Sequence, residues 1–351
     1  MPLAPNALER LVLLRLNRGP GPLLDLVGGA GERAVGLALD LGVFEALADK
    51  PATLAALADW VDCDPDGLEP LLGFLVALGY LSRDGDRYAN TAMTRAWLLD
   101  DPESIAPWLR FWEEVVFPFW DENLEPAVRT GAPAQTLYEW LDDHPDQWRA
   151  THEGFRAAAS VLAPAVVEKL DLPDDARVLD VGGGHGLYAA ELAAENPGAT
   201  VTVFDTEPAE EIAIETAEQA GVGYRVSFEA GDYTTDALDA TSEGYDAALL
   251  FNVVHAHDGP EIIALLERVH EALQPGGRLY VLDQFEGTAR TALGRATVGF
   301  IGLTYLVTLG QRAHPVDDVE AWLDEAGFGV RDRESFLTAP GLSLLVADRL
   351  D

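Results

Sequence analysis

Residues Val178-Leu-Asp-Val-Gly-Gly-Gly-His-Gly186 decide the fold of this chain. The apolar run 177–181 predicts a short buried strand, and residues 187–195 have helical character. Four of the five residues between them are glycine. Glycine allows a sharp bend and lets a ligand approach the backbone with no Cβ atom in the way. A strand, a glycine turn and a helix in this order predict a nucleotide-binding βαβ unit.

The spacing of the glycines separates two kinds of nucleotide ligand. The dinucleotide fingerprint G-x-G-x-x-G would put its third glycine at Leu187, but here it stands one place earlier, at Gly186. Asp180 precedes the turn, and a carboxylate there suits a ligand with an ammonium group and no pyrophosphate. S-adenosyl-L-methionine fits that description. Asp205, which ends the next expected strand, is suited to accept hydrogen bonds from both ribose hydroxyls.

The rest of the second half continues the alternation of strands and helices. Strands are expected over 200–204 and 245–252, and a glycine turn leads into a fifth strand within 273–282. Asp232 suits the adenine amino group and Tyr233 the adenine ring. The class is α/β, with a Rossmann-like sheet that binds ligands at its carboxyl edge. The expected cofactor residues are Asp180, Gly182, Gly183, Gly184, Gly186, Asp205, Thr206, Gly231, Asp232, Tyr233 and Asn252.

The first hundred residues predict a compact helical unit that ends in a β-ribbon. Helices are expected over 34–47, 54–61 and 65–78, the last two capped by Thr53 and Asp64, and Thr91 caps the helix that leads out. A hairpin over 80–88 has Asp84 and Gly85 at its turn. Three helices and a hairpin form the winged-helix pattern. DNA binding is not expected, because the third helix carries no arginine or lysine.

The segment 101–170 predicts a helical connector that is rich in aromatic side chains. Most of these rings are expected to pack between helices, and some to line a pocket for a flat organic substrate. The boundary before the second half is clearest at residues 171–175. The candidate substrate residues of the whole chain are Trp112, Phe155, Phe300, Tyr305 and His314.

Composition bounds the partners and the compartment. The formal net charge of −37 over 351 residues repels phosphate backbones and anionic membranes, so neither nucleic acid nor a membrane is an expected partner. Adaptation to high salt accounts for such a surface. Cys63 is the only cysteine, which excludes an internal disulfide and a cysteine metal cluster, and no metal is expected. No signal peptide is evident and the apolar stretch 298–309 is too short to span a bilayer, so a cytoplasmic protein is expected.

Residues 22–349 resemble the plant-type small-molecule O-methyltransferases and their bacterial and archaeal relatives. The resemblance rests on the segments 178–186, 204–205, 231–232, 252–255, 275–277, 325–328 and 87–91. It implies a winged-helix domain over 1–100 that forms an intertwined homodimer and closes part of the partner's pocket. It also implies a class I methyltransferase domain over 171–351. The implied reaction is methylation of a hydroxyl group on an aromatic or polyketide-like small molecule.

His255 follows the fourth expected strand, and a neutral imidazole is a suitable general base for a phenol or enol hydroxyl. By the resemblance, His255 matches the family's catalytic histidine and Asp283 the carboxylate that orients it. The chain departs from the family where His-Asp-Trp is replaced by His255-Ala-His257. It departs again at residues 310–314, which lack the family's second acid. Either His257 or His314 could substitute for that acid, and otherwise both are expected to face solvent.

Three other functions remain open from the sequence. The first is methyl transfer to nitrogen or carbon, or a relative of this fold that no longer transfers a methyl group. The second is a ligand-sensing winged-helix regulator, which predicts a basic recognition helix that this sequence does not have. The third is a nicotinamide oxidoreductase, which would bind NAD(P)H and not S-adenosylmethionine.

Overall fold

The computed structural model describes residues 7–16, 18, 21–99, 104–238, 244–336, 339 and 341–351. The chain divides into two compact units, one ending at Glu114 and one beginning at Val115. The helical connector expected over residues 101–170 is therefore shared between the two units.

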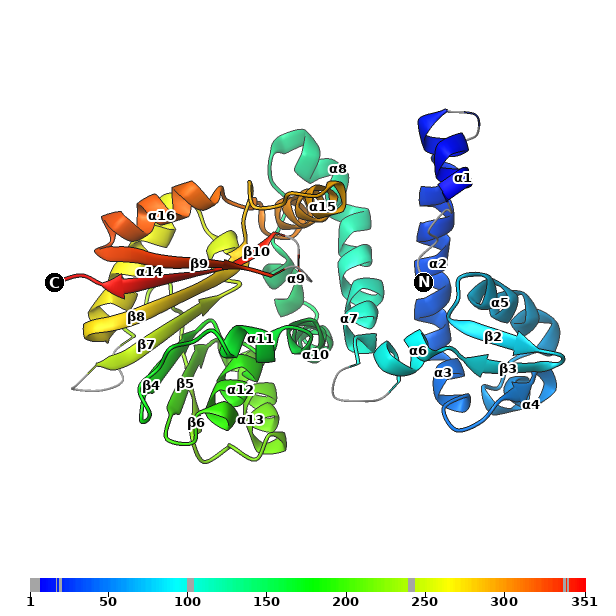
Figure 1. Ribbon diagram of the computed structural model, residues 1–351, viewed down its shortest axis with the longest axis horizontal. Helices are drawn as coiled ribbons and strands as arrows, with labels where there is room; N and C mark the ends of the chain where they lie inside the picture. The colour runs from blue at the N-terminus through cyan, green and yellow to red at the C-terminus, as the bar shows by residue number, and fades with distance from the viewer. Residues whose placement is uncertain are drawn as a thin grey trace. The chain divides into compact units, whose positions relative to one another are not determined.

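The first unit consists of helices and a small sheet, coloured blue to cyan in Figure 1. Its elements are α1 (Ala7–Arg10), η1 (Leu11–Arg15), α2 (Leu23–Asp40), α3 (Val43–Ala46), β1 (Ala52–Thr53), α4 (Leu54–Trp60), α5 (Pro65–Ala77), β2 (Leu81–Asp84), β3 (Arg87–Asn90), α6 (Ala92–Trp97) and α7 (Ala106–Phe111). The three described strands pair antiparallel in the order β1-β3-β2, and β1 was not expected. Phe44 and Tyr88 are the largest side chains of its buried core.

The expected caps of this unit are confirmed. The side chains of Thr53, Asp64 and Thr91 each accept a hydrogen bond from a backbone N–H in the first turn of the helix that follows. Each cap satisfies a donor that has no partner within its helix. The helices expected from Thr53 and Asp64 therefore begin where the sequence predicted.

Two local expectations in this unit are wrong. The helix expected over 34–47 is interrupted, because Gly42 adopts a left-handed φ of 71° between α2 and α3. The hairpin turn is also displaced by one residue. Asp84 pairs with Arg87 in the ladder, so Gly85, with a φ of 61°, and Asp86 form the turn.

The second unit begins with four helices and continues as an α/β domain. The segment η2 (Trp112–Val116) crosses the division between the units. Its further elements are α8 (Phe117–Thr130), α9 (Leu137–Asp142), α10 (Asp146–Ser160), α11 (Ala163–Val167), β4 (Arg177–Val181), α12 (Leu187–Glu195), β5 (Thr200–Asp205), η3 (Glu207–Ala209), α13 (Glu210–Gln219), β6 (Val226–Ala230), β7 (Tyr245–Phe251), η4 (Val254–Ala256), α14 (Gly259–Ala272), β8 (Leu273–Gln284), α15 (Ala292–Leu309), α16 (Val316–Glu325), β9 (Phe328–Ser335) and β10 (Leu342–Arg349).

The described strands of this unit form one seven-stranded sheet in the order β6-β5-β4-β7-β8-β10-β9. Strands β4 to β8 are parallel, and β10 pairs antiparallel with both β8 and β9. The chain moves outward in one direction from β4 to β6 and in the other from β7 to β8. Ligands of such sheets bind at the carboxyl edge where the order reverses, which here is the edge of β4 and β7.

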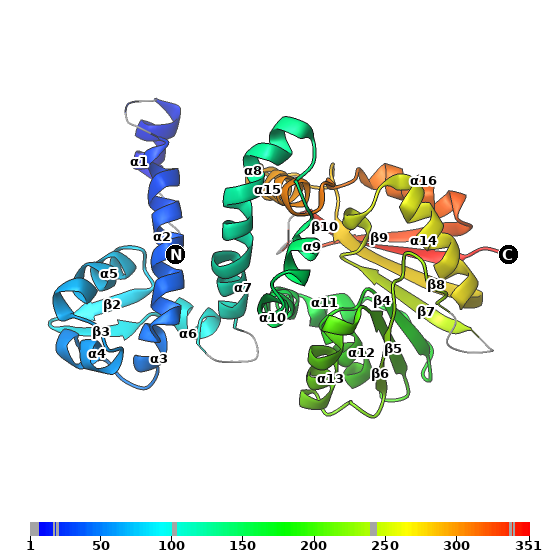
Figure 2. The ribbon, with the colours of Figure 1, turned by 180° about the vertical axis from the view of Figure 1, so that it is seen from behind.

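Alternate residues of the central strands face two separate cores. Val178, Val201 and Leu249 pack with α11 and α12, whereas Leu179 and Leu250 pack with α14 and α16. The helices cover the two faces of the sheet, as Figures 1 and 2 show from opposite sides. Because both faces are covered, the sequences of the central strands are nearly continuous apolar runs. This packing fixes the ends of β4, β5 and β7 against one another.

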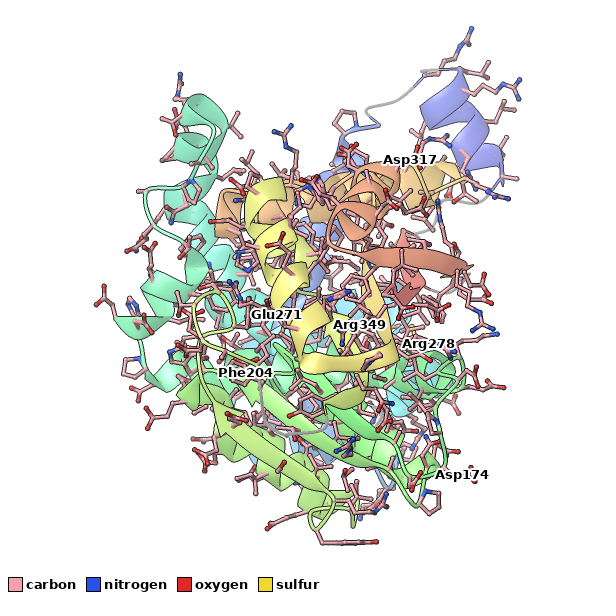
Figure 3. All side chains as sticks on the ribbon, turned by 90° about the vertical axis from the view of Figure 1, so that its left-hand side faces the viewer. Asp174, Phe204, Glu271, Arg278, Asp317 and Arg349 are labelled. Atoms are coloured by element: carbon pink, nitrogen blue, oxygen red, sulfur yellow. The ribbon has the colours of Figure 1, made fainter. Side chains whose placement is uncertain are left out.

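Ion pairs lie away from the carboxyl edge of β4 and β7, on the other side of the sheet. Arg278 of β8 lies 2.9 Å from Asp171 and 3.2 Å from Asp348, and Figure 3 labels it near Arg349. Asp171 begins the segment 171–175, and this contact anchors the segment to the sheet.

The helix α15 is longer than the apolar stretch 298–309 suggested. It has 18 residues, and by length and composition alone it is the one described helix that could cross a membrane. A core helix can pass the same test. Within the second unit α15 packs against α8, α9 and η4, which holds its side chains near the carboxyl end of β7.

Candidate active site

The glycine turn after β4 is packed so tightly that side chains have no room in it. A Cβ atom on Gly182 would lie 2.6 Å from Val253, and one on Gly183 would lie 2.5 Å from the carboxylate of Asp180. Gly186 opens α12 with a left-handed φ of 68° and touches the backbone of Ala213 on α13. Gly184 differs, because a Cβ atom there would meet nothing closer than 3.8 Å. The turn therefore leaves open space on one side, at Gly184.

Asp180 is a buried carboxylate without a protein partner. Its side chain is 1% exposed, and neither oxygen accepts a hydrogen bond within the described part of the chain. Burial, followed by the charge of Asp205, raises the pKa of Asp180 to about 7. An unpaired buried carboxylate is unfavourable, so a cationic group beside it would be stabilising.

Asp205, at the end of β5, is tied to the same turn. Its Oδ2 accepts the backbone N–H of Gly184 at 2.8 Å, and its Oδ1 accepts the N–H of Thr206 at 2.6 Å and the Thr206 hydroxyl at 3.2 Å. Burial raises the pKa of Asp205, although these hydrogen bonds oppose the shift. Oδ1 therefore already accepts two hydrogen bonds, whereas Oδ2 keeps a further lone pair for a ligand. Thr206 thus orients Asp205.

The remaining cofactor candidates lie beyond β6 and β7. The ring of Tyr233 comes within 3.4 Å of the position of a Cβ atom on Gly182, and its hydroxyl lies 3.1 Å from Nε2 of His257. Asp232 is exposed and accepts hydrogen bonds from the N–H and hydroxyl of Thr234, which lower its pKa.

Two candidates depend on backbone geometry. The ring of Phe204 covers Gly231, and a Cβ atom there would lie 2.3 Å from it. Asn252 has a φ of 57°, a left-handed conformation that asparagine tolerates, and its N–H donates to Leu282 at 2.7 Å. Both candidates lie at carboxyl ends of the sheet strands.

His255 and Asp283 form a hydrogen-bonded pair. Nδ1 of His255 lies 2.9 and 3.1 Å from the two Asp283 oxygens. The carboxylate also accepts the backbone N–H of His255 at 3.1 Å and that of Gln284 at 2.7 Å. Because a carboxylate can only accept, Nδ1 carries the proton and Nε2 presents its lone pair. Within the described structure, Nε2 has no hydrogen-bond partner.

Tyr305 on α15 covers the imidazole of His255. The two rings are parallel within 2°, with centroids 3.8 Å apart. The His255 side chain is 13% exposed, so its ring is held between Tyr305 and Asp283 and still reaches open space. Of the five substrate candidates, Tyr305 is the one that the structure brings into contact with His255.

The expectation that His257 and His314 face solvent is wrong. His314 is 9% exposed, packs edge-on against Trp322 and contacts the backbone oxygen of His257 through Nε2 at 2.9 Å. His257 is 16% exposed, and burial lowers its pKa. Both rings are used in packing, because α14 and α16 cover them. No second carboxylate contacts the imidazole of His255 in the described residues.

The three remaining substrate candidates lie on η2, α10 and α15. Trp112 is buried and belongs to the first unit, where its ring meets Trp108. Phe300 is 44% exposed and leans against Trp120. Phe155 is half-buried on α10. Their roles toward a substrate stay predictions.

The structure adds two histidines that the sequence did not single out. His152 on α10 is 6% exposed, and burial lowers its pKa to about 4. His185 in the glycine turn accepts the N–H of Leu187 at 3.1 Å, and burial lowers its pKa to about 3. His152 could not be identified from sequence, because no motif connects α10 to the turn. Among the described residues, no three His, Cys, Asp or Glu side chains gather as metal ligands.

Known proteins share both the sequence pattern and this geometry. The model of the O-methyltransferase domain matches residues 124–329, and that of the O-methyltransferase dimerisation domain matches residues 31–100. The chain is 30% identical over 317 residues to the tetracenomycin polyketide synthesis 8-O-methyl transferase of Streptomyces glaucescens, which covers 89% of this chain and 92% of that protein. The chain belongs to the O-methyltransferase family.

Two further relatives define the breadth of this O-methyltransferase family. An N,N-dimethyltransferase of Streptomyces rimosus is 30% identical over 209 residues, 58% of each chain. The crystal structure of human N-acetylserotonin methyltransferase in complex with S-adenosylmethionine superposes with a TM-score of 0.79 at 25% identity, over 100% of both chains. The α/β fold with an amino-terminal dimerisation domain is therefore confirmed, as is an S-adenosylmethionine-dependent enzyme that acts on a small molecule.

The turn of this O-methyltransferase fits its cofactor. S-adenosyl-L-methionine carries an ammonium group and a ribose diol. The partnerless carboxylate of Asp180 suits the first, and the lone pair that Oδ2 of Asp205 keeps suits the second. The open face of Gly184 leaves room for the ligand to approach the backbone.

Proposed function

We propose that this O-methyltransferase methylates a hydroxyl group of an aromatic or polyketide-like small molecule, with His255 as its general base. The observation that carries the proposal is the pair in which Asp283 holds Nδ1 of His255 and leaves Nε2 free. The 8-O-methyl transferase of tetracenomycin polyketide synthesis supports the acceptor class. The aromatic ring of Tyr305 beside His255 supports it as well.

The residues of the pair have separate tasks. S-adenosylmethionine supplies an electrophilic methyl group. Nε2 of His255 accepts the proton that the acceptor hydroxyl loses as its oxygen forms the bond to carbon, while the bond from that carbon to sulfur breaks and leaves S-adenosylhomocysteine. Asp283 stabilises the imidazolium that results, and Tyr305 keeps the ring from turning. Because the second acid is missing, Asp283 is the one carboxylate that orients His255 in the described residues.

The cofactor would be held by residues from four strand ends. Asp180 near the end of β4 takes the ammonium group, and Asp205 at the end of β5 takes the ribose hydroxyls. Asp232 and Tyr233 take the adenine amino group and ring. Gly184 lets the ligand approach the backbone, whereas the other glycines of the turn and Gly231 let protein atoms pack closely around the site. Thr206 and Asn252 support the loops on either side.

Binding of the cofactor product is expected to release a proton from Asp180. The pKa of Asp180 is about 7 in the free protein. An adjacent ammonium group favours the ionised carboxylate and lowers that pKa, so below about pH 7 the complex holds fewer protons than the free protein. The affinity for S-adenosylhomocysteine should therefore fall as the pH is lowered from about 7 to about 5.

Calorimetry in two buffers of different ionisation enthalpy measures this proton release. In Asp180→Asn the release should disappear and the affinity should lose its pH dependence over this range. Wild-type protein that binds with no proton release near pH 6.5 would contradict the role of Asp180.

The reaction is tested with purified protein, S-adenosylmethionine and matched acceptors. Each phenol in the panel has an aniline analogue with the amino group at the same position, and the panel includes hydroxynaphthoates and hydroxylated polycyclic quinones. We expect methylated phenols by mass spectrometry, with the methyl group assigned to oxygen by NMR. Faster methylation of the anilines, or of ring carbon, would favour the alternative reaction that the N,N-dimethyltransferase relative supports.

We also infer a homodimer and a cytoplasmic location. The dimerisation domain over residues 31–100 supports the dimer, as do the exposed leucines of α2. Leu23, Leu26 and Leu37 are 51%, 69% and 49% exposed, which is unfavourable in water unless a partner covers them. Light scattering in high salt tests the dimer. The match of residues 124–329 to the O-methyltransferase domain supports the cytoplasmic location.

A further inference from the structure

His152 is a buried histidine whose ring nitrogens are both unpaired. It lies on α10, which contacts α12 and α13 beside the glycine turn. The side chain is 6% exposed, and neither nitrogen has a hydrogen-bond partner within the described residues. Buried polar groups are nearly always paired, and an unpaired one calls for an explanation. Packing alone would be satisfied by an apolar side chain of similar size.

The ring borders the open face of the glycine turn. Nδ1 of His152 lies 3.8 Å from the position that a Cβ atom on Gly184 would take, and Oδ2 of Asp205 lies 3.8 Å from the same position. Apart from the adjoining residues of the turn, no other atom of the described residues comes within 4 Å of it. The histidine and the carboxylate therefore flank one space, and this is the space that the missing side chain of Gly184 keeps open.

The imidazole is held in this position by a stack of rings. His152 stacks on Trp148, with centroids 5.6 Å apart and planes 19° apart, and Trp148 stacks on Tyr138 at 5.9 Å. Burial keeps the pKa of His152 far below neutrality, so the ring is uncharged and has one N–H donor and one acceptor nitrogen. A positioned neutral imidazole suits a neutral polar ligand group better than an anion.

We propose that His152 donates a hydrogen bond to a ribose hydroxyl of the bound cofactor, opposite Asp205. The carboxylate of Asp205 can only accept, so it takes hydroxyl protons and leaves the hydroxyl oxygens without a donor. The N–H of His152 supplies that donor from the other side of Gly184. Asp180 lies at the adjoining position, where a Cβ atom on Gly183 would meet its carboxylate, and serves the amino-acid end. The proposal depends on cofactor binding and not on the acceptor or on His255.

The test compares ligands that share the ribose. Calorimetry measures the dissociation constants of S-adenosylhomocysteine, adenosine, 2′-deoxyadenosine and 3′-deoxyadenosine for wild type and His152→Phe. Phenylalanine keeps a ring stacked on Trp148 and removes both nitrogens. We expect the constants of S-adenosylhomocysteine and adenosine to rise by the same factor, about tenfold, which corresponds to one hydrogen bond. One of the two deoxy ligands lacks the hydroxyl that His152 contacts, and the variant and wild type should bind that ligand with equal affinity.

Two variants serve as controls. His144→Phe changes an exposed histidine that stacks on Trp140, and it should leave every dissociation constant unchanged. His152→Gln keeps a donor and an acceptor and should retain most of the wild-type affinity. A purely structural role for the ring would not predict this result. If His152→Phe does not fold, His152→Gln is measured in its place. The ribose contact then predicts that His152→Gln binds adenosine and the two deoxy ligands in the same order of affinity as wild type does.

Other outcomes overturn the proposal. A loss of affinity for S-adenosylhomocysteine with no loss for adenosine would assign His152 to the amino-acid end of the cofactor. A ratio of variant to wild-type constants that grows as the pH falls below about 6.5 would indicate a charged imidazole on a carboxylate. Unchanged constants for all four ligands would mean that a buried water satisfies the ring. In each case methyl transfer by wild-type protein, and therefore the proposed function, would stand.

Discussion

Replacing His255 with alanine is expected to lower kcat for a phenol acceptor by about 10²–10⁴-fold, the range typical of a lost general base. The proton of the acceptor hydroxyl would then lose its acceptor, because Nε2 is the nitrogen that Asp283 leaves without a hydrogen bond in the described structure. The dissociation constant of S-adenosylhomocysteine should stay the same, because His255 lies outside the glycine turn.

A series of acceptors separates a base from a positioning residue. For a nitrophenol that is already ionised at the assay pH, His255→Ala should lose much less activity than for the parent phenol. An equal loss for both acceptors would assign His255 to positioning. Asp283→Asn is expected to impair the parent phenol in the same selective way, because an amide can turn its NH₂ group toward Nδ1 and disturb the tautomer.

Replacing Gly184 with alanine is expected to weaken binding of S-adenosylhomocysteine on the order of 100-fold, or about 2.7 kcal/mol. The protein itself has room for the methyl group, since the nearest atoms are 3.8 Å away. The ligand does not, because the methyl group enters the space that His152 and Asp205 flank. Calorimetry measures the affinity and thermal unfolding measures the stability.

A second glycine isolates the effect of backbone strain. Gly221 has a left-handed φ of 72°, compared with 48° for Gly184, and a Cβ atom there would meet nothing within 4 Å. Alanine costs roughly 1–2 kcal/mol of stability in this conformation at either site. Gly221→Ala should thus lose stability with no change in affinity. If Gly184→Ala binds the ligand as wild type does, the ligand does not approach the turn at Gly184.

Local patterns predicted the central βαβ unit almost to the residue. The strand 177–181 and the helix 187–195 were both found as expected, and so were the caps at Thr53, Asp64 and Thr91. These features depend on neighbouring residues only, through apolar runs, glycine φ values and short capping bonds. The predicted position of the hairpin turn and the predicted helix over 34–47 were wrong. In each case one glycine takes a left-handed conformation at a position that the local pattern did not specify.

The sequence by itself determined the order of strands and helices, the acid before the glycine turn and the acid at the end of the next strand. Only the tertiary structure decided which side chains from distant elements meet. It brought Tyr305 of α15 onto His255, buried His257 and His314, and set His152 of α10 against Gly184. The physical reason is that these contacts join residues 32 to 57 positions apart, and the packing of helices on the sheet, not any local pattern, brings them together.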